Sequence, residues 1–207
     1  MPRIQNGSCF SMNSTSEQMF ARPALIDAWL DLLFLLMQTR GIAHYGEGVS
    51  QLDHMLQSAQ LAKDRDYSEH LVAAALLHDI GHLLGDEPED AATQGIDTKH
   101  EQRGSAWLAQ VFPESVYVPI ALHVAVKRYL CTVDSNYHAN LSHASRLSLS
   151  LQGGPMNSEQ VKAFENSRWF KDAMALRSLD DHAKQTNARP SDLQSYRLLL
   201  KKIILNQ

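Results

Sequence analysis

Two side chains suited to metal binding stand next to each other at the end of an apolar helical run. The run Leu71–Leu77 leads directly into His78 and Asp79. Adjacent residues on an α-helix point about 100° apart, so both can face one polar site only where the helix turns inward. An imidazole and a carboxylate together can hold a divalent cation, and the carboxylate keeps a second oxygen for another ion. The fold must therefore direct this helix end toward a polar site.

Composition narrows the class of protein. The chain has 207 residues, of which 44% are hydrophobic and 20% charged, and this suits one globular domain with a real core. The net charge is −4, so we expect no binding to nucleic acid or to an anionic membrane. Cys9 and Cys131 do not make a disulfide framework, which favours the reducing cytoplasm. Oligomeric state has no signature in the sequence.

The first residues differ from the rest. Residues 1–18 are polar and rich in Ser and Asn, without the basic and apolar regions of a secretory signal. The most apolar stretch, Ala28–Met37, contains Asp31 and is too short to span a bilayer. We expect residues 1–20 to be a weakly ordered tail and residues 21–207 to form a single domain.

Nearly every later segment has the pattern of a helix. Pro23 and Gly41 bracket the first helix, Ser50 and Ser68 can cap the next two, and Gly81 is expected to stop the third. No segment predicts a strand, and residues 85–95 read as a loop, so the expected class is an all-α, compact bundle. Helices are expected at 23–40, 51–65, 69–80, 99–111, 114–131, 135 to just before Gly153, 158–165, 167–185 and 190–205.

Further histidines and aspartates lie on these helices among apolar neighbours. His54 is inside the second helix, His100 begins the fourth, His123 is central in the fifth, and Asp180 and Asp181 share a late helix. Each alone is more often a satisfied core residue or part of a solvated face. Together they need a common partner because buried polar groups must be satisfied. A metal cluster is the economical partner.

The order of these residues resembles the HD-domain superfamily of metal-dependent proteins, over about residues 40–185. The resemblance implies an HD-domain bundle with two ions, in which Asp79 is the bridge. One ion would take His54, His78 and Asp180, and the other His100 and His123. Asp180 is preferred to Asp181 because, in the oxygenase branch related to myo-inositol oxygenase, the last Asp stands four residues before a Lys, here Lys184.

A second set of residues shares helix faces with these candidates. Lys127 follows His123 by four residues, and Arg177 precedes Asp180 by three. His82, four residues after His78, and Ser145, on the sixth expected helix, complete a possible anion pocket. Each cation alone is more often a solvated surface residue, but the shared register favours a site.

This second set resembles the PhnZ-type phosphonate oxygenases. The resemblance implies a mixed-valent Fe(II)/Fe(III) pair, no organic cofactor, and O2-dependent cleavage of the C–P bond of 2-amino-1-hydroxyethylphosphonate, or of an N-methylated analogue, to glycine or its analogue and phosphate. Glu47, in a Gly-Glu-Gly segment before His54, would pair with the substrate ammonium. The alternative is a metal-dependent phosphohydrolase acting on a nucleotide or phosphomonoester. A binding module with a degenerate site is disfavoured because no ligand is missing.

One position departs from that family. Its members carry a Tyr two residues before this Gly, where it can ligate an iron until substrate binds. Here His44 occupies the position and Tyr45 follows it. Either residue can act as the gate, or the gate is absent. Tyr45 also leaves open a cage for a trimethylated amine.

Overall fold

All regular elements of the described chain are helices, which confirms the predicted class. The computed structural model describes residues 23–44 and 48–206, and the expected tail, residues 1–20, lies outside that range. A 3₁₀ turn, Leu193–Tyr196, precedes the last helix. The α-helices are α2 (Pro23–Arg40), α3 (Gln51–Asp64), α4 (Glu69–Leu77), α5 (Ile80–Leu84), α6 (His100–Leu108), α7 (Glu114–Val133), α8 (Ser135–Ala139), α9 (His143–Leu151), α10 (Ser158–Glu165), α11 (Phe170–His182) and α12 (Arg197–Leu205).

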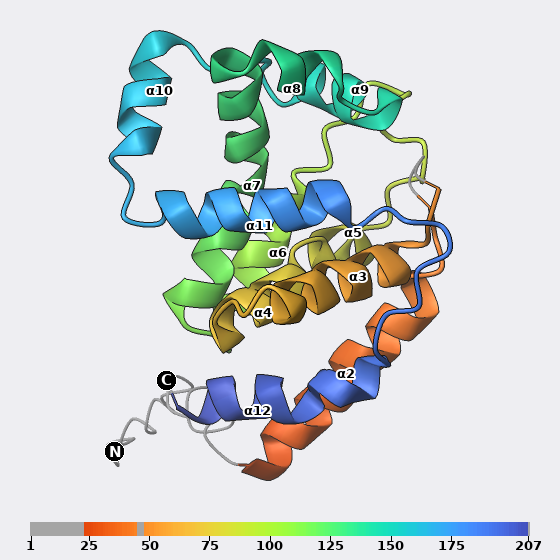
Figure 1. Ribbon diagram of the computed structural model, residues 1–207. Helices are drawn as coiled ribbons and strands as arrows, with labels where there is room; N and C mark the ends of the chain where they lie inside the picture. Colours follow the sequence, from red (N-terminus) through yellow and green to blue (C-terminus); the bar gives the residue numbers. More distant parts are fainter. Residues whose placement is uncertain (1–22, 45–47, 207) are drawn as a thin grey trace, which may run out of the picture.

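The helices form three tiers (Figure 1). In the middle tier, α3 packs on α4, and α7 lies against α4, α6 and α11. The helices α2 and α12 pair at one end, while α8, α9 and α10 form the other end. Fully buried side chains such as Met55, Leu76, Ile120 and Leu176 fill the space between the middle helices. The middle tier therefore supplies the rigid frame for any site built on its helices.

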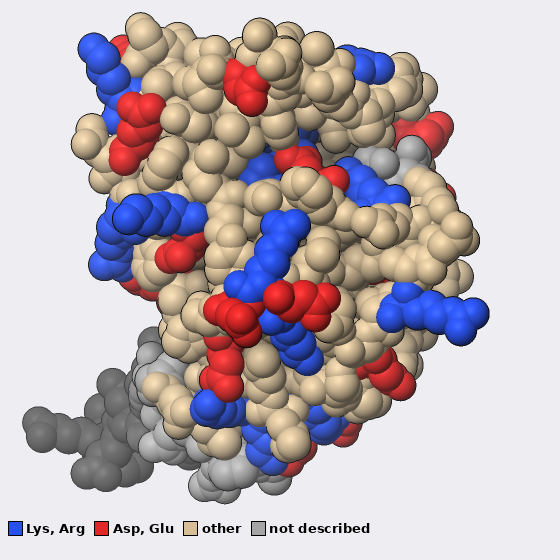
Figure 2. Space-filling model, in the orientation of Figure 1, with Lys and Arg blue, Asp and Glu red and all other residues tan. Residues whose placement is uncertain are grey.

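Charged side chains on the face seen in Figure 2 include both signs, interspersed among uncharged ones. This mixture fits the net charge of −4. Among the described helices, one, α7, is long and apolar enough to cross a membrane by length and composition alone. Its residues His123 and Lys127 are buried inside the protein, however, which is the behaviour of a core helix.

The chain breaks its helix at the His-Asp pair. The helix α4 is capped by Ser68, whose hydroxyl accepts from the Leu71 N–H, and it ends at Leu77. Asp79 has φ −102° and ψ 9°, outside helical geometry, and α5 begins at the next residue. The prediction of one helix stopped by Gly81 was wrong, because Gly81 lies inside α5. The break lets two adjacent side chains face one site.

Other boundaries also differ from the prediction. The sixth expected helix is divided into α8 and α9, because the Ser142 side chain caps a new start by accepting from the Ser145 N–H. The last helix begins at Arg197 rather than 190, after the 3₁₀ turn that Asp192 caps. Pro190 therefore lies in the loop before this turn and does not start a helix.

Gly81 allows α5 and α6 to approach at backbone distance. A Cβ atom added to Gly81 would lie 1.9 Å from the carbonyl oxygen of His100. On the facing helix, a Cβ added to Gly104 would lie 3.0 Å from the Gly81 nitrogen. Only a residue without a side chain fits at this crossing. The crossing fixes His100, the first residue of α6, beside the His78–Asp79 break.

We predict that Gly81→Ala destabilises the protein by about 1–3 kcal/mol, the usual cost of overpacking a tight contact. Urea unfolding followed by circular dichroism measures this change. The less crowded Gly104→Ala variant should lose less stability. Equal midpoints for Gly81→Ala and the unchanged protein would show that α5 and α6 can separate at no cost.

Candidate metal centre

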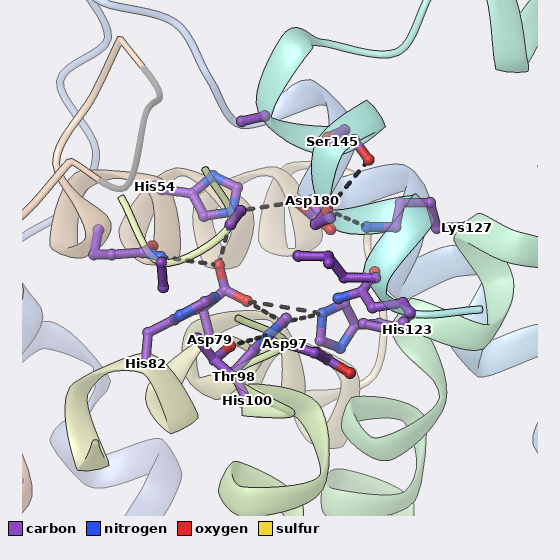
Figure 3. A pocket seen from close by; sticks show the side chains of 18 of the residues that line it. His54, Asp79, His82, Asp97, Thr98, His100, His123, Lys127, Ser145 and Asp180 are labelled. Carbon is purple, nitrogen blue, oxygen red and sulfur yellow. Dashed lines mark hydrogen bonds and ion pairs between the residues drawn. The ribbon is translucent and has the colours of Figure 1, made fainter. Parts of the chain in front are cut away.

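Five of the six predicted ligands line one cavity of about 140 Å³, and the sixth, His78, is fully buried against His54. Its walls come from α3, α5, α6, α7, α9 and α11, so segments from His54 to Asp180 meet there. Figure 3 shows the rings of His54, His100 and His123 grouped around Asp79, with Asp180 on the His54 side. Residues from separate helices thus come together at this cavity.

Two histidines lie on one side of the Asp79 carboxylate. The Nε2 atoms of His54 and His78 are 3.0 Å apart. Asp79 Oδ2 lies 3.5 Å from each of these nitrogens, and Asp180 Oδ1 lies 3.2 Å from His54 Nε2. The Nε2 atoms of His54 and His78 and one oxygen from each of Asp79 and Asp180 therefore face the same small space.

Two other histidines lie on the opposite side. The Nε2 atoms of His100 and His123 are 3.1 Å apart. Asp79 Oδ1 lies 3.5 Å from the first and 3.8 Å from the second. The two oxygens of one carboxylate thus serve two separate histidine pairs, as a bridging ligand would.

The hydrogen bonds of the rings fix which nitrogen faces inward. The Nδ1–H groups of three of the histidines donate to carbonyl oxygens: His54 to Ala183 at 3.0 Å, His78 to Ala75 at 2.8 Å, and His123 to Ile120 at 2.7 Å. A carbonyl can only accept, so the inward Nε2 atom of each neutral ring offers a lone pair. Outer hydrogen bonds of this kind commonly orient metal-binding histidines.

Burial keeps part of the cluster neutral. It lowers the pKa of His123 to about 4 and the pKa of His100 well below its usual range. Lone pairs facing each other at these distances repel, and a cation shared between them removes the repulsion. The buried donor set therefore fits a metal and defines a metal-binding site.

Arg177 holds one oxygen of Asp180 and leaves the other for the cluster. Its Nη1 lies 2.7 Å from Asp180 Oδ2, whereas Oδ1 faces His54. Asp181 instead contacts the other edge of the guanidinium. Asp180 is thus the member of the Asp-Asp pair that faces the cluster.

The expected anion pocket adjoins this cluster. Lys127 is only 4% exposed, and burial together with the nearby Arg177 lowers the pKa of its ammonium to about 7. Its Nζ donates to Ser148 Oγ at 2.7 Å, while Ser145 lines the same cavity. His82 stacks on His100 with ring centroids 4.0 Å apart.

Sequence reasoning named Ser145 and overlooked Ser148. The two serines are three residues apart on α9, so helical spacing could have indicated both. It also overlooked Gln51, which stands three residues before His54 and donates from Nε2 to Asp79 Oδ2 at 3.4 Å. The same spacing rule would have placed Gln51 on the face of α3 that carries His54.

The candidate gate is only partly within the described chain. His44 is exposed at the cavity mouth, and its backbone N–H lies 3.5 Å from the Glu89 carboxylate. Tyr45 and Glu47 lie outside the described residues. Lys184, just beyond α11, also lines the cavity.

An all-helical fold with a buried histidine–aspartate metal site at a His-Asp helix break defines an HD-domain protein. Residues 52–128 match the model of the HD domain family. The chain is 45% identical to the hydroxymethylphosphonate dioxygenase of Gimesia maris over 165 residues, which are 79% of this chain and 82% of that protein. The chain belongs to the HD-domain family.

A second relative has a related name. The chain is 36% identical over 170 residues to the [1-hydroxy-2-(trimethylamino)ethyl]phosphonate dioxygenase (glycine-betaine-forming) of Leisingera caerulea. This similarity spans 82% of this chain and 87% of that protein. Both relatives are thus named as dioxygenases of 1-hydroxyphosphonates.

We predict that Asp79→Ala removes most bound metal, because one carboxylate faces both histidine pairs. Elemental analysis after loading with iron under anaerobic conditions measures this loss. Lys127→Ala is the matched control: it empties a buried position in the same cavity but should keep metal near the unchanged level. Metal loss in Lys127→Ala would place that amine among the groups that hold the ions.

Proposed function

We propose that the protein is a diiron dioxygenase that cleaves the C–P bond of a 1-hydroxyphosphonate. The observation that carries this proposal is the division of the Asp79 oxygens between two histidine pairs, 3.5 Å from His54 on one side and 3.5 Å from His100 on the other. A dinuclear metal site explains this division. The names of both relatives support the reaction class.

The proposed ligands divide into two groups around Asp79. Neutral imidazoles and carboxylates suit iron, among other divalent metals. When bound, two irons as an Fe(II)/Fe(III) pair would supply the activation of O2 and a positive charge that attracts the substrate oxygens. One iron is assigned to His54, His78, Asp79 and Asp180, and the other to Asp79, His100 and His123.

The second role of the chain is to bind and orient the phosphonate. Lys127 supplies a buried ammonium, Arg177 a fixed guanidinium, and Ser145 and His82 supply neutral donors on the same cavity. Charged donors in a low-dielectric cavity bind a dianion more strongly than they would in water. Ser148, already bonded to Lys127, orients the ammonium.

The overall reaction balances with O2 as the oxidant. R–CH(OH)–PO₃²⁻ and O2 give R–COO⁻, HPO₄²⁻ and a proton, so the C–P and C–H bonds break and both oxygen atoms enter the products. We infer 2-amino-1-hydroxyethylphosphonate, or its N-methylated analogue, as the substrate, with Glu47 facing the ammonium. Hydroxymethylphosphonate is a second candidate because the Gimesia maris relative named for it is 45% identical.

We predict that the iron-loaded protein releases phosphate from one or more of these three phosphonates only while it consumes O2. An oxygen electrode with a phosphate assay measures both quantities. Ordinary phosphomonoesters with Mg²⁺ or Mn²⁺ are the comparison substrates. Phosphate release without oxygen, or rapid phosphoester hydrolysis, would favour the phosphohydrolase alternative.

Glu47 separates the candidate substrates. Glu47→Gln should raise KM for the amino compound, because the carboxylate partner of the ammonium is lost. It should leave KM for hydroxymethylphosphonate nearly unchanged, because that compound has no amine. An equal rise in KM for both substrates would show that Glu47 does not bind the amine.

The pKa of Lys127 predicts how substrate binding depends on pH. The ammonium form, which attracts the phosphonate, is present below about pH 7 and is lost above it. We expect KM to rise above about pH 7, by at most about tenfold per pH unit for one proton. Lys127→Arg keeps its charge and should show a smaller rise. Titration of the phosphonate itself affects both proteins equally, so identical pH profiles would contradict the role of Lys127.

A further inference from the structure

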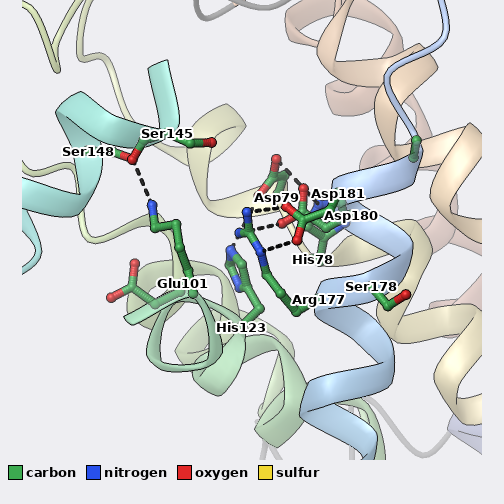
Figure 4. A network of polar contacts seen from close by, with 12 residues as sticks. His78, Asp79, Glu101, His123, Ser145, Ser148, Arg177, Ser178, Asp180 and Asp181 are labelled. Carbon is green, nitrogen blue, oxygen red and sulfur yellow. Dashed lines mark hydrogen bonds and ion pairs between the residues drawn. The ribbon is translucent and has the colours of Figure 1, made fainter. Parts of the chain in front are cut away.

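Arg177 lies between two aspartates of its own helix, and each aspartate takes a different edge of the guanidinium. The Nη1 atom contacts Asp180 Oδ2 at 2.7 Å. The opposite edge, Nε and Nη2, contacts the two oxygens of Asp181, with Nε 3.1 Å from Oδ2. Figure 4 shows the guanidinium joined to both carboxylates by dashed lines. Arg177 is 4% exposed, so water screens little of this charge.

With Asp181 on one edge of the guanidinium, Arg177 does not form a bidentate pair with Asp180. A buried guanidinium and a carboxylate prefer a bidentate contact, in which two parallel N–H groups take both oxygens. Arg177 and Asp180 are three residues apart on α11, close enough for such a contact. It would draw Asp180 Oδ1 away from His54 Nε2, now 3.2 Å distant. The cluster would then lose a carboxylate oxygen.

Tyr137 holds Asp181 against the Nε edge of the Arg177 guanidinium. Its hydroxyl donates to Asp181 Oδ2 at 2.8 Å and accepts from Arg177 Nε at 2.9 Å. The ring belongs to α8 and packs with Cys131, Leu141 and Leu149. The Asp181 carboxylate is thus tied to a second helix as well as to Arg177, and it cannot rotate away without breaking both bonds.

We propose that Asp181, held by Tyr137, is a positioning residue that occupies one edge of Arg177 and so keeps Asp180 Oδ1 available for the metal on the His54 side. This inference rests on the dinuclear site of the proposed function. In this role Asp181 does not contact the ion. It competes with Asp180 for Arg177, which would otherwise bind both oxygens of Asp180.

The proposal predicts a defined coupling between Asp181 and Arg177. In Asp181→Asn the amide binds the guanidinium weakly, so Arg177 can turn both N–H groups to Asp180. Loss of such an outer partner commonly weakens metal binding by about 10–100-fold, and we expect a fall of about tenfold for one Fe²⁺ equivalent, the one on the His54 side, while the other equivalent changes less. Anaerobic titration of the full-length protein with Fe²⁺ against a colorimetric chelator measures this affinity.

The double variant separates competition from simple loss of charge. With Arg177→Gln in place, no guanidinium competes for Asp180, so adding Asp181→Asn should change Fe²⁺ affinity by less than about twofold, within the scatter expected of uncoupled sites. If loss of the Asp181 charge alone weakens Fe²⁺ binding, the tenfold fall in affinity persists in the Arg177→Gln background and the proposal fails. An unchanged affinity in Asp181→Asn itself also overturns it.

Tyr137→Phe tests the same contact without changing charge. It should lower Fe²⁺ affinity in the direction of Asp181→Asn but less, because the carboxylate keeps its bonds to Arg177. Tyr129→Phe is the matched control, since that hydroxyl donates to Glu165 at 2.9 Å on the protein surface, and it should leave the affinity unchanged. An equal effect of both Tyr variants would count against the proposal.

Failure of this inference differs visibly from failure of the proposed function. If the unchanged protein binds no Fe²⁺, the metal site itself is wrong. If it binds Fe²⁺ but cleaves no phosphonate, the reaction is wrong while the coupling between Asp181 and Arg177 can still be measured. If both succeed and the coupling is missing, only the role of Asp181 is wrong.

Discussion

The arrangement of the middle helices depends on one buried carboxylate. Burial opposes ionisation of Asp79, but Coulomb attraction to the neighbouring histidines, His78 first, lowers the pKa of its carboxyl well below the usual range. A charge in this position has a large desolvation cost unless several groups face it. The helices α3, α6, α7 and α11 each bring a polar group to it or to its neighbours. Of these, α3, α7 and α11 pack on α4, and α6 packs on α5 and α7.

Much of this could be predicted from the sequence, because the signals are local. Helical spacing and caps placed α2, α3 and α10 within a residue or so of their bounds, and the apolar neighbours of His54 and His123 indicated that these rings point inward. The ligand pairing came from resemblance to a family rather than from spacing. The structure brings the same residues together.

The parts that could not be predicted depend on contacts distant in the sequence. Gly81 looked like a helix stop, but its role is to let α6 approach, and only the position of His100 reveals this. Asp181 looked like a solvated acid, and Tyr137 carried no signal, because their partnership joins residues 44 positions apart. Ser148 was within reach of spacing rules, but only the direction of the Lys127 side chain singles it out.

The break between α4 and α5 divides the cluster mechanically. His78 follows the last residue of α4, which is buried in the core against α3 and α7. Asp79 directly precedes the short helix α5, which packs on α6. The His54–His78 side therefore joins α3 to the end of α4, whereas the His100 side joins the start of α6 to His123 on α7. A shift of α5 and α6 relative to α4 would change the His100 side of the cluster before it changed the His54–His78 side.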